Sequence, residues 1–529
     1  MAEISSYFFL AFAMLGYIVF KIVYRLVFHP LASVPGDKIA AATLLYEFFW
    51  DAVMGGKYVF RIAEMHEKHG SRRPLSESIW VLLTPRTGPV VRISRREVHV
   101  NDPCFFDVLY TSRDEKDEWF YNFDGTNTSV FATGPHNAHR RRRGALARLF
   151  TVANVAKVEP ALLLHLQKLF SRMDEARQTG EVFNCSDAFR CLTMDTISGM
   201  TEPQCRNALD SPDFARSFHR TVRVASASMT WQRYLPVLTA LEYTPRCLLR
   251  AIDPNIAGLL EKREELQNNA KKELEGGPDM KDGQSPTALH ALGVSKILPQ
   301  EDKNVWRMAI EAETLLNAGT ETTGLSLAMM VYHLHKHPNV FQRLKSELLA
   351  CSPLPKESFV DFQTLNRLPY LQAVIQETLR VTCPVSGRLP RINSARPLVF
   401  AKTIPNAKTY VFPPGTVISM SIMDLHHHAS IFTNPKEFVP ERWLDEPGNF
   451  TSEEQRRLMR KYLLPFGKGS RSCIGLELAK LELVLSAGNL FRRFDLELFE
   501  TTERDMEMAH DWIAPFGHAD SEGLRVKIK

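Results

Sequence analysis

The segment FGKGSRSCIG, residues 466–475, constrains this chain more than any other. It places one cysteine, Cys473, between glycines and basic residues, directly before a helix-like apolar run. Backbone amides at the start of a helix stabilise negative charge, and Lys468 and Arg471 add positive charge. The glycines let the backbone pass close to a flat group. We therefore expect Cys473 to ionise more easily than a buried thiol; the alternative is a cysteine that caps a surface helix by chance.

The amino terminus has the features of a membrane anchor. The run YFFLAFAMLGYIVF (Tyr7 to Phe20) carries no charge, and its extension to Phe28 reaches the length that a bilayer span requires. Glu3 precedes the run and basic residues follow it, so the positive-inside tendency places the body of the protein in the cytosol. A cleaved secretory signal is the alternative, but it needs positive charge before the apolar run and a small-residue cleavage site after it.

The segment after the anchor contains helix-breaking residues. Pro30, Pro35 and Gly36 indicate a stiff connection rather than a continuing helix. We therefore expect a membrane anchor over residues 1–29, a proline-rich hinge over 30–45 and a catalytic domain over 46–529.

The pattern of apolar residues predicts the fold class. A chain of 529 residues with 44% hydrophobic residues can bury a large core. Apolar residues recur at helical spacing over residues 160–176, 302–336, 368–381 and 475–494. Shorter β-like segments lie at residues 89–100 and 409–421. The chain is therefore predicted to be mostly α with a small β lobe.

One segment interrupts this organisation. The residues before and after SRRPLSESIWVLLTPRT, residues 71–87, would join naturally as a helix, a turn and a strand without it. We interpret it as an atypical surface insertion; a translated retained intron is the alternative.

Composition and spacing argue against several other classes. The eight cysteines form no C-x-x-C pair, which argues against a zinc site or a disulfide framework. The net charge of +5 is mildly basic, and the only dense basic cluster, residues 139–148, is the sole candidate for nucleic-acid binding, which we do not expect. No G-x-G-x-x-G fingerprint accompanies a βαβ unit. The chain therefore needs an external source of reducing electrons for any redox chemistry.

The pattern F-G-x-G-x-R-x-C-x-G resembles the haem-ligand loop of the cytochrome P450 family. The resemblance implies a cytochrome P450 fold that binds haem b, with Cys473 as the axial thiolate ligand of the iron. It also implies that Phe466 shields the sulfur, that Gly467 belongs to the loop, and that Arg471 meets a haem propionate.

A second motif supports the same resemblance. AGTETT, residues 318–323, lies inside a long apolar run, where an acid and a hydroxyl are costly unless they meet partners, water or a ligand. In the family this segment crosses the haem. The resemblance implies that Ala318 and Gly319 make room for dioxygen and that Thr322 and Glu321 supply protons during its activation. The alternative is a helix distorted by a threonine that bonds back to its own backbone.

Two further motifs complete a structural network. In ETLR, Glu377 and Arg380 stand at i, i+3 on one helix face and can pair. The same spacing occurs at Glu454 and Arg457, which we interpret as a solvated helix face. In the family the arginine of PERW, here Arg442, joins the ETLR pair in a buried network that supports the thiolate loop.

The basic cluster is predicted to serve the same cofactor. HNAHRRRRGALARLF resembles the family helix in which His139 and Arg143 would contact a haem propionate. In GRLPR, Arg391 offers another such contact, and Arg388 is a near alternative. The HHH sequence at residues 426–428 resembles an ordinary connecting segment, so we do not predict a metal site there.

The segment over residues 24–70, YRLVFHPLASVPGDKIAAATLLYEFFWDAVMGGKYVFRIAEMHEKHG, resembles filamentous-fungal members near trichodiene oxygenase, which oxidise terpenoids and other secondary metabolites. The resemblance implies an endoplasmic-reticulum, single-pass monooxygenase that oxidises an apolar terpenoid, polyketide or related molecule. Electrons would come from NADPH through a separate cytochrome P450 reductase, with cytochrome b5 as a further candidate partner. The predicted substrate contacts come from residues 123–131, residues 226–237, Leu315, Val385 and Ile513. A haem-thiolate isomerase or dehydratase that does not use dioxygen, and a non-catalytic haem protein, are the alternatives.

Overall fold

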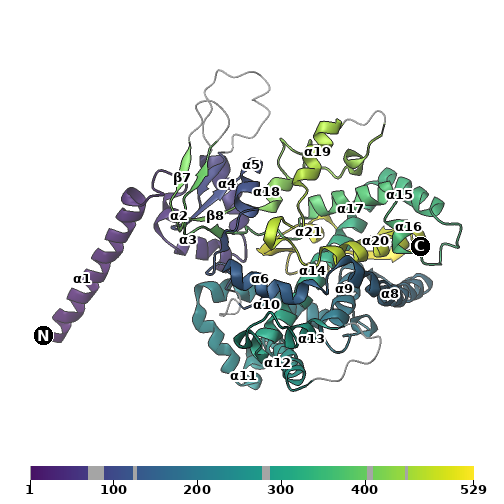
Figure 1. The fold of residues 1–529 in the computed structure, drawn as a ribbon, viewed down its shortest axis with the longest axis horizontal. Helices are drawn as coiled ribbons and strands as arrows, with labels where there is room; N and C mark the ends of the chain where they lie inside the picture. Colours follow the sequence, from purple (N-terminus) through teal and green to yellow (C-terminus); the bar gives the residue numbers. More distant parts are fainter. Residues whose placement is uncertain (1, 70–87, 123–127, 277–285, 402–408, 447–450) are drawn as a thin grey trace.

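The computed structural model describes residues 2–69, 88–122, 128–276, 286–401, 409–446 and 451–529. Figure 1 shows a long helix, α1 (Ala2–Val23), projecting from a mostly helical body that carries small sheets. This architecture confirms the predicted fold class. The predicted insertion over residues 71–87 lies outside the described residues, as do residues 123–127 of the predicted substrate segment.

The helices divide into an amino-terminal and a carboxy-terminal set. The first set after α1 is η1 (Tyr24–Phe28), α2 (Lys38–Ala42), α3 (Leu45–Phe48), η2 (Phe49–Val53), α4 (Tyr58–His69), α5 (Pro103–Tyr110), α6 (His136–Ala147), α7 (Val152–Val155), α8 (Glu159–Thr179), α9 (Cys185–Thr201), α10 (Arg216–Tyr234), α11 (Arg246–Ile252) and α12 (Pro254–Leu274). The second set is α13 (Ala288–Gly293), α14 (Val305–Lys336), α15 (Pro338–Ala350), α16 (Phe362–Leu365), α17 (Pro369–Thr382), α18 (Ile422–His426), η8 (Pro440–Trp443), α19 (Glu453–Tyr462), η9 (Gly469–Arg471), α20 (Leu476–Arg493) and α21 (Glu503–Met506).

The strands are short. They are β1 (Val90–Arg92), β2 (Glu97–Val100), β3 (Glu115–Lys116), β4 (Phe183–Asn184), β5 (Arg391–Ile392), β6 (Leu398–Phe400), β7 (Tyr410–Phe412), β8 (Val417–Ser419), β9 (Leu496–Leu498), β10 (His510–Trp512), β11 (Ala514–Phe516) and β12 (Arg525–Ile528).

The body is organised around α14. The side chain of Asn304 accepts a hydrogen bond from the backbone N–H of Arg307 and so caps the start of this 32-residue helix, while Lys336 adds positive charge to its last turn. Most of its side chains are buried, and it packs against α9, α12, α17 and α20. A helix that is covered on several sides forms the axis of the core.

The largest sheet has the strand order β1-β2-β8-β5-β3. Strands β1 and β2 pair antiparallel, with Val91 opposite His99. Strands β2 and β8 run parallel, with Val98 opposite Ile418, and Ile418 also lies opposite Arg391 of the antiparallel β5. This register fixes Arg391 at an inner strand of the sheet.

The long helices agree with the sequence-based expectations. The four predicted helical runs correspond to α8, α14, α17 and α20, with ends that agree to within three residues. The predicted β-like segments contain β1 with β2 and β7 with β8. Between β7 and β8, Gly415 adopts a φ of +82°, a left-handed conformation that glycine adopts easily.

The predicted hinge is packed against the body. Leu31 and Val34 are buried, and the backbone N–H of Arg92 donates to Pro35 O at 2.6 Å. Part of the predicted hinge forms α2, whose alanines are buried. Residues 30–45 therefore form a fixed connection rather than a loose joint.

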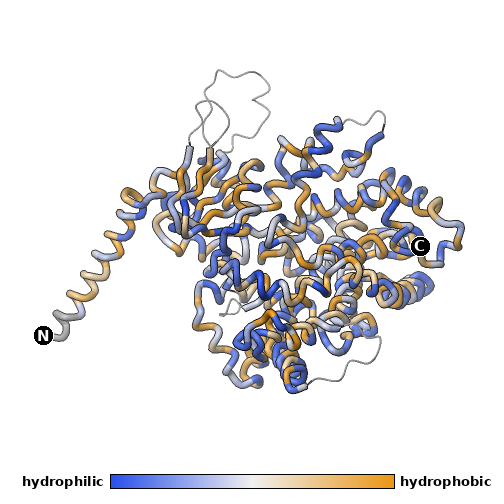
Figure 2. The backbone as a smooth tube through the Cα atoms, viewed as in Figure 1, coloured by the Kyte–Doolittle hydropathy of each residue, from blue (hydrophilic) through white to orange (hydrophobic). Residues whose placement is uncertain are grey.

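The amino-terminal helix has an exposed apolar surface. The stretch Tyr7–Phe28 is long and apolar enough to cross a membrane, and none of it is buried inside the body. Figure 2 shows hydrophobic colouring along much of α1. A second apolar stretch, residues 136–179, is divided among α6, α7 and α8, and α8 packs against α9 and α20.

Helices α9 and α14 approach closely at Gly319. A methyl group at this position would lie 2.8 Å from Ile197 Cγ1, and Ile197 is a buried β-branched residue with little rotamer freedom. The exposed Gly199 of α9 provides a matched control, because a methyl group there would meet no atom within 4 Å.

We expect Gly319→Ala to lower the stability of the full-length protein. Overpacking costs about 1–3 kcal/mol, against a gain in helix propensity of about 1 kcal/mol. Gly199→Ala should leave the thermal unfolding midpoint unchanged or raise it, because only the propensity term applies. Equal downward shifts in the two variants would contradict the packing argument.

Candidate functional site

The loop before α20 is a tight turn that requires its glycines. Gly467 and Gly469 adopt φ values of +67° and +74°, and a methyl group at Gly469 would lie 2.5 Å from Tyr110 O. The backbone N–H of Cys473 donates to Phe466 O at 2.8 Å, which closes the turn. The loop therefore holds Cys473 at a fixed position directly before α20.

Cys473 combines a deep position with an accessible side chain. Burial raises the pKa of its thiol, whereas a hydrogen bond from the Gly475 backbone and the charge of Arg143 act in the opposite direction. Its side chain is nevertheless exposed to solvent. The pKa therefore moves in the direction opposite to the one that the sequence predicted, while the side chain stays accessible to solvent.

The cation beside this cysteine differs from the predicted ones. Lys468 forms an ion pair with Asp107 at 2.6 Å, and Arg471 donates to the backbone carbonyls of Thr133 and Gly134. Arg143 instead donates through Nη1 to Ser472 O at 2.6 Å. The expected positive charge is therefore present, but Arg143 of α6 supplies it.

Helix α14 also carries an accessible face in the middle of the molecule. Ala318 is exposed although most of the helix is buried, and Thr322 Oγ1, one turn later, donates to Ala318 O at 2.8 Å. Because α14 packs against α20, this face and the Cys473 loop belong to neighbouring elements.

Gly319 and Glu321 of this motif face α9. Gly319 contacts Ile197, so it serves the packing of α9 on α14, and the expected small pair divides into one accessible residue and one packing residue. The Glu321 carboxylate accepts a hydrogen bond from Arg190 Nε at 2.9 Å. The structure thus holds Glu321 through an arginine that the sequence did not single out.

Four cations gather around the Cys473 loop. Burial and the charges of Arg391, Arg471 and Arg143 lower the pKa of Lys116 well below its usual value. Burial and then Arg391 lower the pKa of Arg471 to about 10. Among the described residues, none of these four cations forms an ion pair with a carboxylate. A cluster of this kind requires an anionic partner.

The predicted His139 lies within this cluster. It is buried in α6, and burial followed by Arg471, Lys116 and Arg143 lowers the pKa of its imidazole to about 2. His139 is therefore neutral at physiological pH, so it can contribute a hydrogen bond but no charge.

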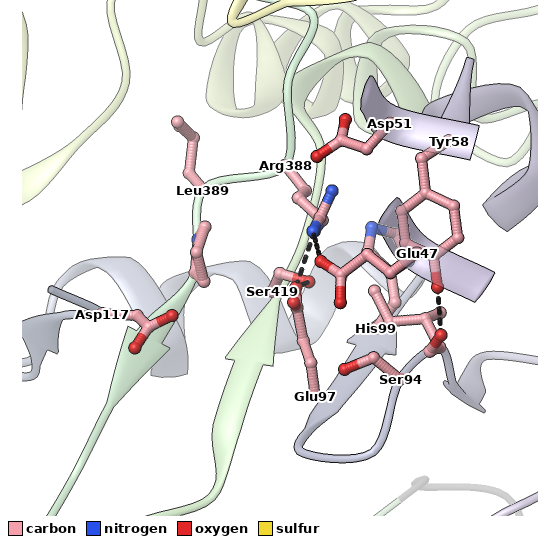
Figure 3. A network of polar contacts seen from close by, with 12 residues as sticks. Glu47, Asp51, Tyr58, Ser94, Glu97, His99, Asp117, Arg388, Leu389 and Ser419 are labelled. Carbon is pink, nitrogen blue, oxygen red and sulfur yellow. Dashed lines mark hydrogen bonds and ion pairs between the residues drawn. The ribbon is translucent and has the colours of Figure 1, made fainter. Parts of the chain in front are cut away.

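The two arginines of GRLPR have separate roles. Figure 3 shows Arg388 between two buried carboxylates: Nε donates to Glu97 at 2.9 Å and Nη2 donates to Glu47. Arg391 instead donates to the hydroxyl of Tyr121 at 3.1 Å and lies near Lys116 and Arg471. The geometry thus favours Arg391 over Arg388 as a residue that could hold an anionic group.

Glu377 is the centre of a buried polar network. Its carboxylate accepts bonds from Arg380 Nε at 3.0 Å and Nη2 at 2.8 Å, and from Arg442 Nε at 3.1 Å. Trp443 Nε1 and the backbone N–H of Val439 donate at 3.0 and 2.9 Å. The structure therefore brings the predicted Glu377, Arg380 and Arg442 together and adds the indole of η8.

His426 connects this network to the cysteine loop. Arg380 Nη1 donates to His426 O at 3.0 Å, and the backbone N–H of Leu464 donates to His426 Nε2 at 2.9 Å. Burial lowers the pKa of His426 to about 3, so its ring stays neutral and can accept this bond. This role could not be predicted from the sequence, because three adjacent histidines do not reveal which one turns inward.

The segments expected to contact substrate meet only in part. Residues from 226–237 and Ile513 line one cavity together with Asp51, Phe120 and Asp511, whereas Leu315 and Val385 lie outside its lining. Ile513 adopts a φ of +73°, which is rare for a β-branched residue, and its carbonyl accepts bonds from Ser386 N and Gly387 N. The sequence could not predict this backbone strain.

The cavity wall is polar. Asp511 accepts a hydrogen bond from Ser386 Oγ at 2.9 Å, and burial followed by the charge of Asp51 raises the pKa of Asp511 to about 6. Arg233 pairs with Asp51 at 2.8 Å.

The residues around Cys473 fit the haem that the sequence resemblance implies. An accessible cysteine on a glycine-turned loop offers a thiolate, and the unpaired cations match the negative charges of two propionates. The orphaned Arg471 Nε is one donor that a propionate would satisfy.

Comparison with known proteins agrees with this geometry. A family model described as Cytochrome P450 matches residues 91–514. The chain is 33% identical to cytochrome P450 monooxygenase MO6277 of Ascocoryne sarcoides, with 96% of each chain covered. It is 34% identical to tryptophan 6-hydroxylase fscE of Fusarium equiseti, covering 96% of this chain and 93% of the other. It is 32% identical to cytochrome P450 monooxygenase TRI4 of Fusarium sporotrichioides, covering 96% of this chain and 92% of the other.

Loss of Glu377 should destabilise the protein and lower its haem content. Glu377→Ala leaves Arg380 and Arg442 as buried cations without their carboxylate, a change that costs about 3–5 kcal/mol. The measurements are the thermal unfolding midpoint and the haem absorbance per protein.

The pair Glu454 and Arg457 supplies the matched control. It has the same i, i+3 spacing, but both residues are exposed on α19. Glu454→Ala should change stability by no more than about 0.5 kcal/mol. If the two variants lost similar amounts of haem, the buried network would not be the support of the cysteine loop.

Proposed function

The chain belongs to the cytochrome P450 family, and on that basis we propose that it is a haem-thiolate monooxygenase that inserts one oxygen atom of dioxygen into a small molecule while the other leaves as water. Cytochrome P450 monooxygenases and hydroxylases among its relatives support the reaction class. The observation that carries the proposal is the accessible Cys473 on its glycine-turned loop, beside cations that have no carboxylate partner.

Cys473 would hold the haem iron, and Lys116, Arg143, Arg391 and Arg471 would hold the propionates. When bound, the haem supplies a thiolate-ligated iron at which dioxygen is activated. The neutral His139 would add a hydrogen bond to the same edge of the group. Phe466 and Gly467 would shape the loop around the sulfur.

Thr322 and Glu321 are the residues that we assign to proton delivery. The hydroxyl of Thr322 lies on the accessible face of α14 and donates its proton to Ala318 O. Its oxygen lone pairs therefore stay free to accept a hydrogen bond from a proton donor. Glu321 lies one residue earlier and is held by Arg190. We propose that Glu321 connects to Thr322 through water when the Arg190 pair opens.

We propose a largely apolar secondary metabolite, such as a terpenoid or polyketide, as the substrate. One of the named relatives is a tryptophan 6-hydroxylase, whose named substrate is an amino acid rather than a terpenoid or polyketide.

Electrons would reach the haem from NADPH through a separate reductase, with cytochrome b5 as a further candidate. The exposed Arg140, Arg141 and Arg148 of the α6 region provide a basic surface for an acidic redox partner. We place the protein in the endoplasmic-reticulum membrane by a single span, with the catalytic body in the cytosol. The exposed apolar stretch Tyr7–Phe28 supports this location.

Two alternatives remain in view: a haem-thiolate isomerase or dehydratase that does not use dioxygen, and a non-catalytic haem protein. The presence of both Thr322 and Glu321 favours oxygen chemistry over either alternative. Product formation without NADPH would support the isomerase or dehydratase.

The carbon monoxide difference spectrum of the reduced, membrane-expressed protein tests the haem assignment. We expect the red-shifted Soret band of a thiolate-ligated haem, and we expect Cys473→Ser to lose it. Haem bound without this band in the wild type would overturn the assignment of Cys473.

Thr322→Ala tests the oxygenase proposal against both alternatives. Because positioned proton donors contribute about 10²–10⁴-fold to such steps, we expect product formed per NADPH to fall by at least about tenfold and peroxide release to rise. The assay uses the first substrate that product analysis identifies.

Thr314→Ala is the matched control for this experiment. Thr314 lies on the same helix and makes the same bond, from Oγ1 to the carbonyl of Ile310 at 2.7 Å. It should retain the coupling of NADPH use to product. Unchanged coupling in Thr322→Ala would count against the proposed role of Thr322.

A further inference from the structure

The end of the membrane anchor is fixed to the body by partly buried hydrogen bonds. Arg92 Nη1 donates to Arg25 O at 2.8 Å, and Arg25 Nη1 donates to Ala42 O at 2.7 Å. The last turn of the apolar stretch, η1, is therefore held beside the turn between β1 and β2. Figure 1 shows α1 leaving the body at this point.

A pocket of about 320 Å³ lies at this junction. Residues from two distant segments line it: Lys21, Tyr24, Arg25, His29, Arg95 and Arg96. Five of these six side chains are basic or can become so, and no carboxylate is among them. The pocket thus concentrates positive charge from the anchor and from the β1–β2 turn.

Most of this charge lacks a carboxylate partner. Arg96 forms an ion pair with Asp117, but among the described residues Lys21, Arg25 and Arg95 form none. Arg95 is half-buried, and its side chain has no hydrogen-bond partner in the part of the chain that the structure describes. The pocket therefore offers charge that the protein itself does not neutralise.

The cations in and beside the pocket repel one another. Burial, then the charges of Arg25 and Arg96, lower the pKa of Arg95, with Glu47 acting in the opposite direction. Burial and the charge of Arg25 lower the pKa of the neighbouring Arg92 to about 10. An anion in the pocket would relieve this repulsion.

The position of the pocket indicates where that anion comes from. It lies at the end of Tyr7–Phe28, the stretch whose length and exposed apolar surface suit a bilayer span. Lys21 and Arg25 follow the charge-free run Tyr7–Phe20, so they lie at the cytosolic end of the span in the proposed orientation. Lipid headgroups carry phosphate at this depth, and anionic lipids are attracted by basic residues next to a span.

We propose that this pocket binds the phosphate headgroup of one anionic membrane lipid. Lys21, Arg25 and Arg95 would contact the phosphate oxygens, and the Tyr24 hydroxyl would donate a further hydrogen bond. This inference rests on the proposed membrane anchoring and is independent of the oxygenase activity.

Native mass spectrometry of the full-length protein in detergent tests the proposal. Phosphatidic acid and phosphatidylcholine are added in separate titrations, and lipid adducts are counted. We expect a saturable adduct with phosphatidic acid and a weaker one with phosphatidylcholine. Arg95→Glu should weaken the phosphatidic acid adduct by about fivefold or more, because each basic residue at a membrane surface contributes about 1 kcal/mol. Lys21→Gln should weaken it in the same direction.

Lys38→Glu is the matched control. It makes the same charge change near the same surface, but Lys38 is exposed and lies outside the pocket lining. It should retain the adduct. Inorganic phosphate added before the lipid distinguishes the two sources of this anion: we expect it not to displace phosphatidic acid at equal concentration.

Three results would overturn the proposal. They are equal binding of the two lipids, equal losses in Arg95→Glu and Lys38→Glu, and displacement of the lipid by equimolar inorganic phosphate. The carbon monoxide spectrum of each variant is recorded in parallel. An unchanged spectrum shows that the body is folded, and it separates a failure of the lipid site from a failure of the haem assignment.

Discussion

The arrangement of the site depends on one buried carboxylate, that of Glu377. It accepts hydrogen bonds from two arginines, an indole and a backbone amide, which come from α17 and from the η8 region. A buried charge is tolerated only when it is paired and fully hydrogen-bonded. The same arginines also bind backbone carbonyls near His426, which in turn holds the chain at Leu464. The loop of Cys473 is therefore positioned by polar contacts that begin at Glu377 on α17 and continue through His426 to Leu464.

The cations around the Cys473 loop, in contrast, are not neutralised by carboxylates among the described residues. Around Glu377 every charge has a partner within the protein, whereas Lys116, Arg143, Arg391 and Arg471 have none among the described carboxylates. The protein therefore carries an electrostatic cost that a bound anion would lower. Because haem has both a thiolate-binding iron and two carboxylates, a single group would satisfy the cysteine and the cations together. Binding of the haem and stability of the fold are consequently coupled.

Sequence patterns predicted the parts of the site that depend on spacing along one element. The loop of Cys473, the i, i+3 pair of Glu377 and Arg380, and the long helices all follow from local rules. Contacts between distant segments were not predictable. Arg190 binds Glu321 from another helix, and Lys116 joins the arginines from a two-residue strand. Likewise, the structure supplies the physical reason for preferring Arg391 to Arg388, because Arg388 is already paired with Glu47 and Glu97.

The anchor helix is held against the body by a packed, hydrogen-bonded connection. A loose hinge would let the body rotate freely over the bilayer. Instead, Arg25 and Arg92 bind the anchor to the edge of the sheet through β1, and Pro35 is bound to the same strand. The same sheet contains Arg391 at β5, two strands from β2. The path from the anchor helix to a residue of the cation cluster therefore runs through hydrogen-bonded strands.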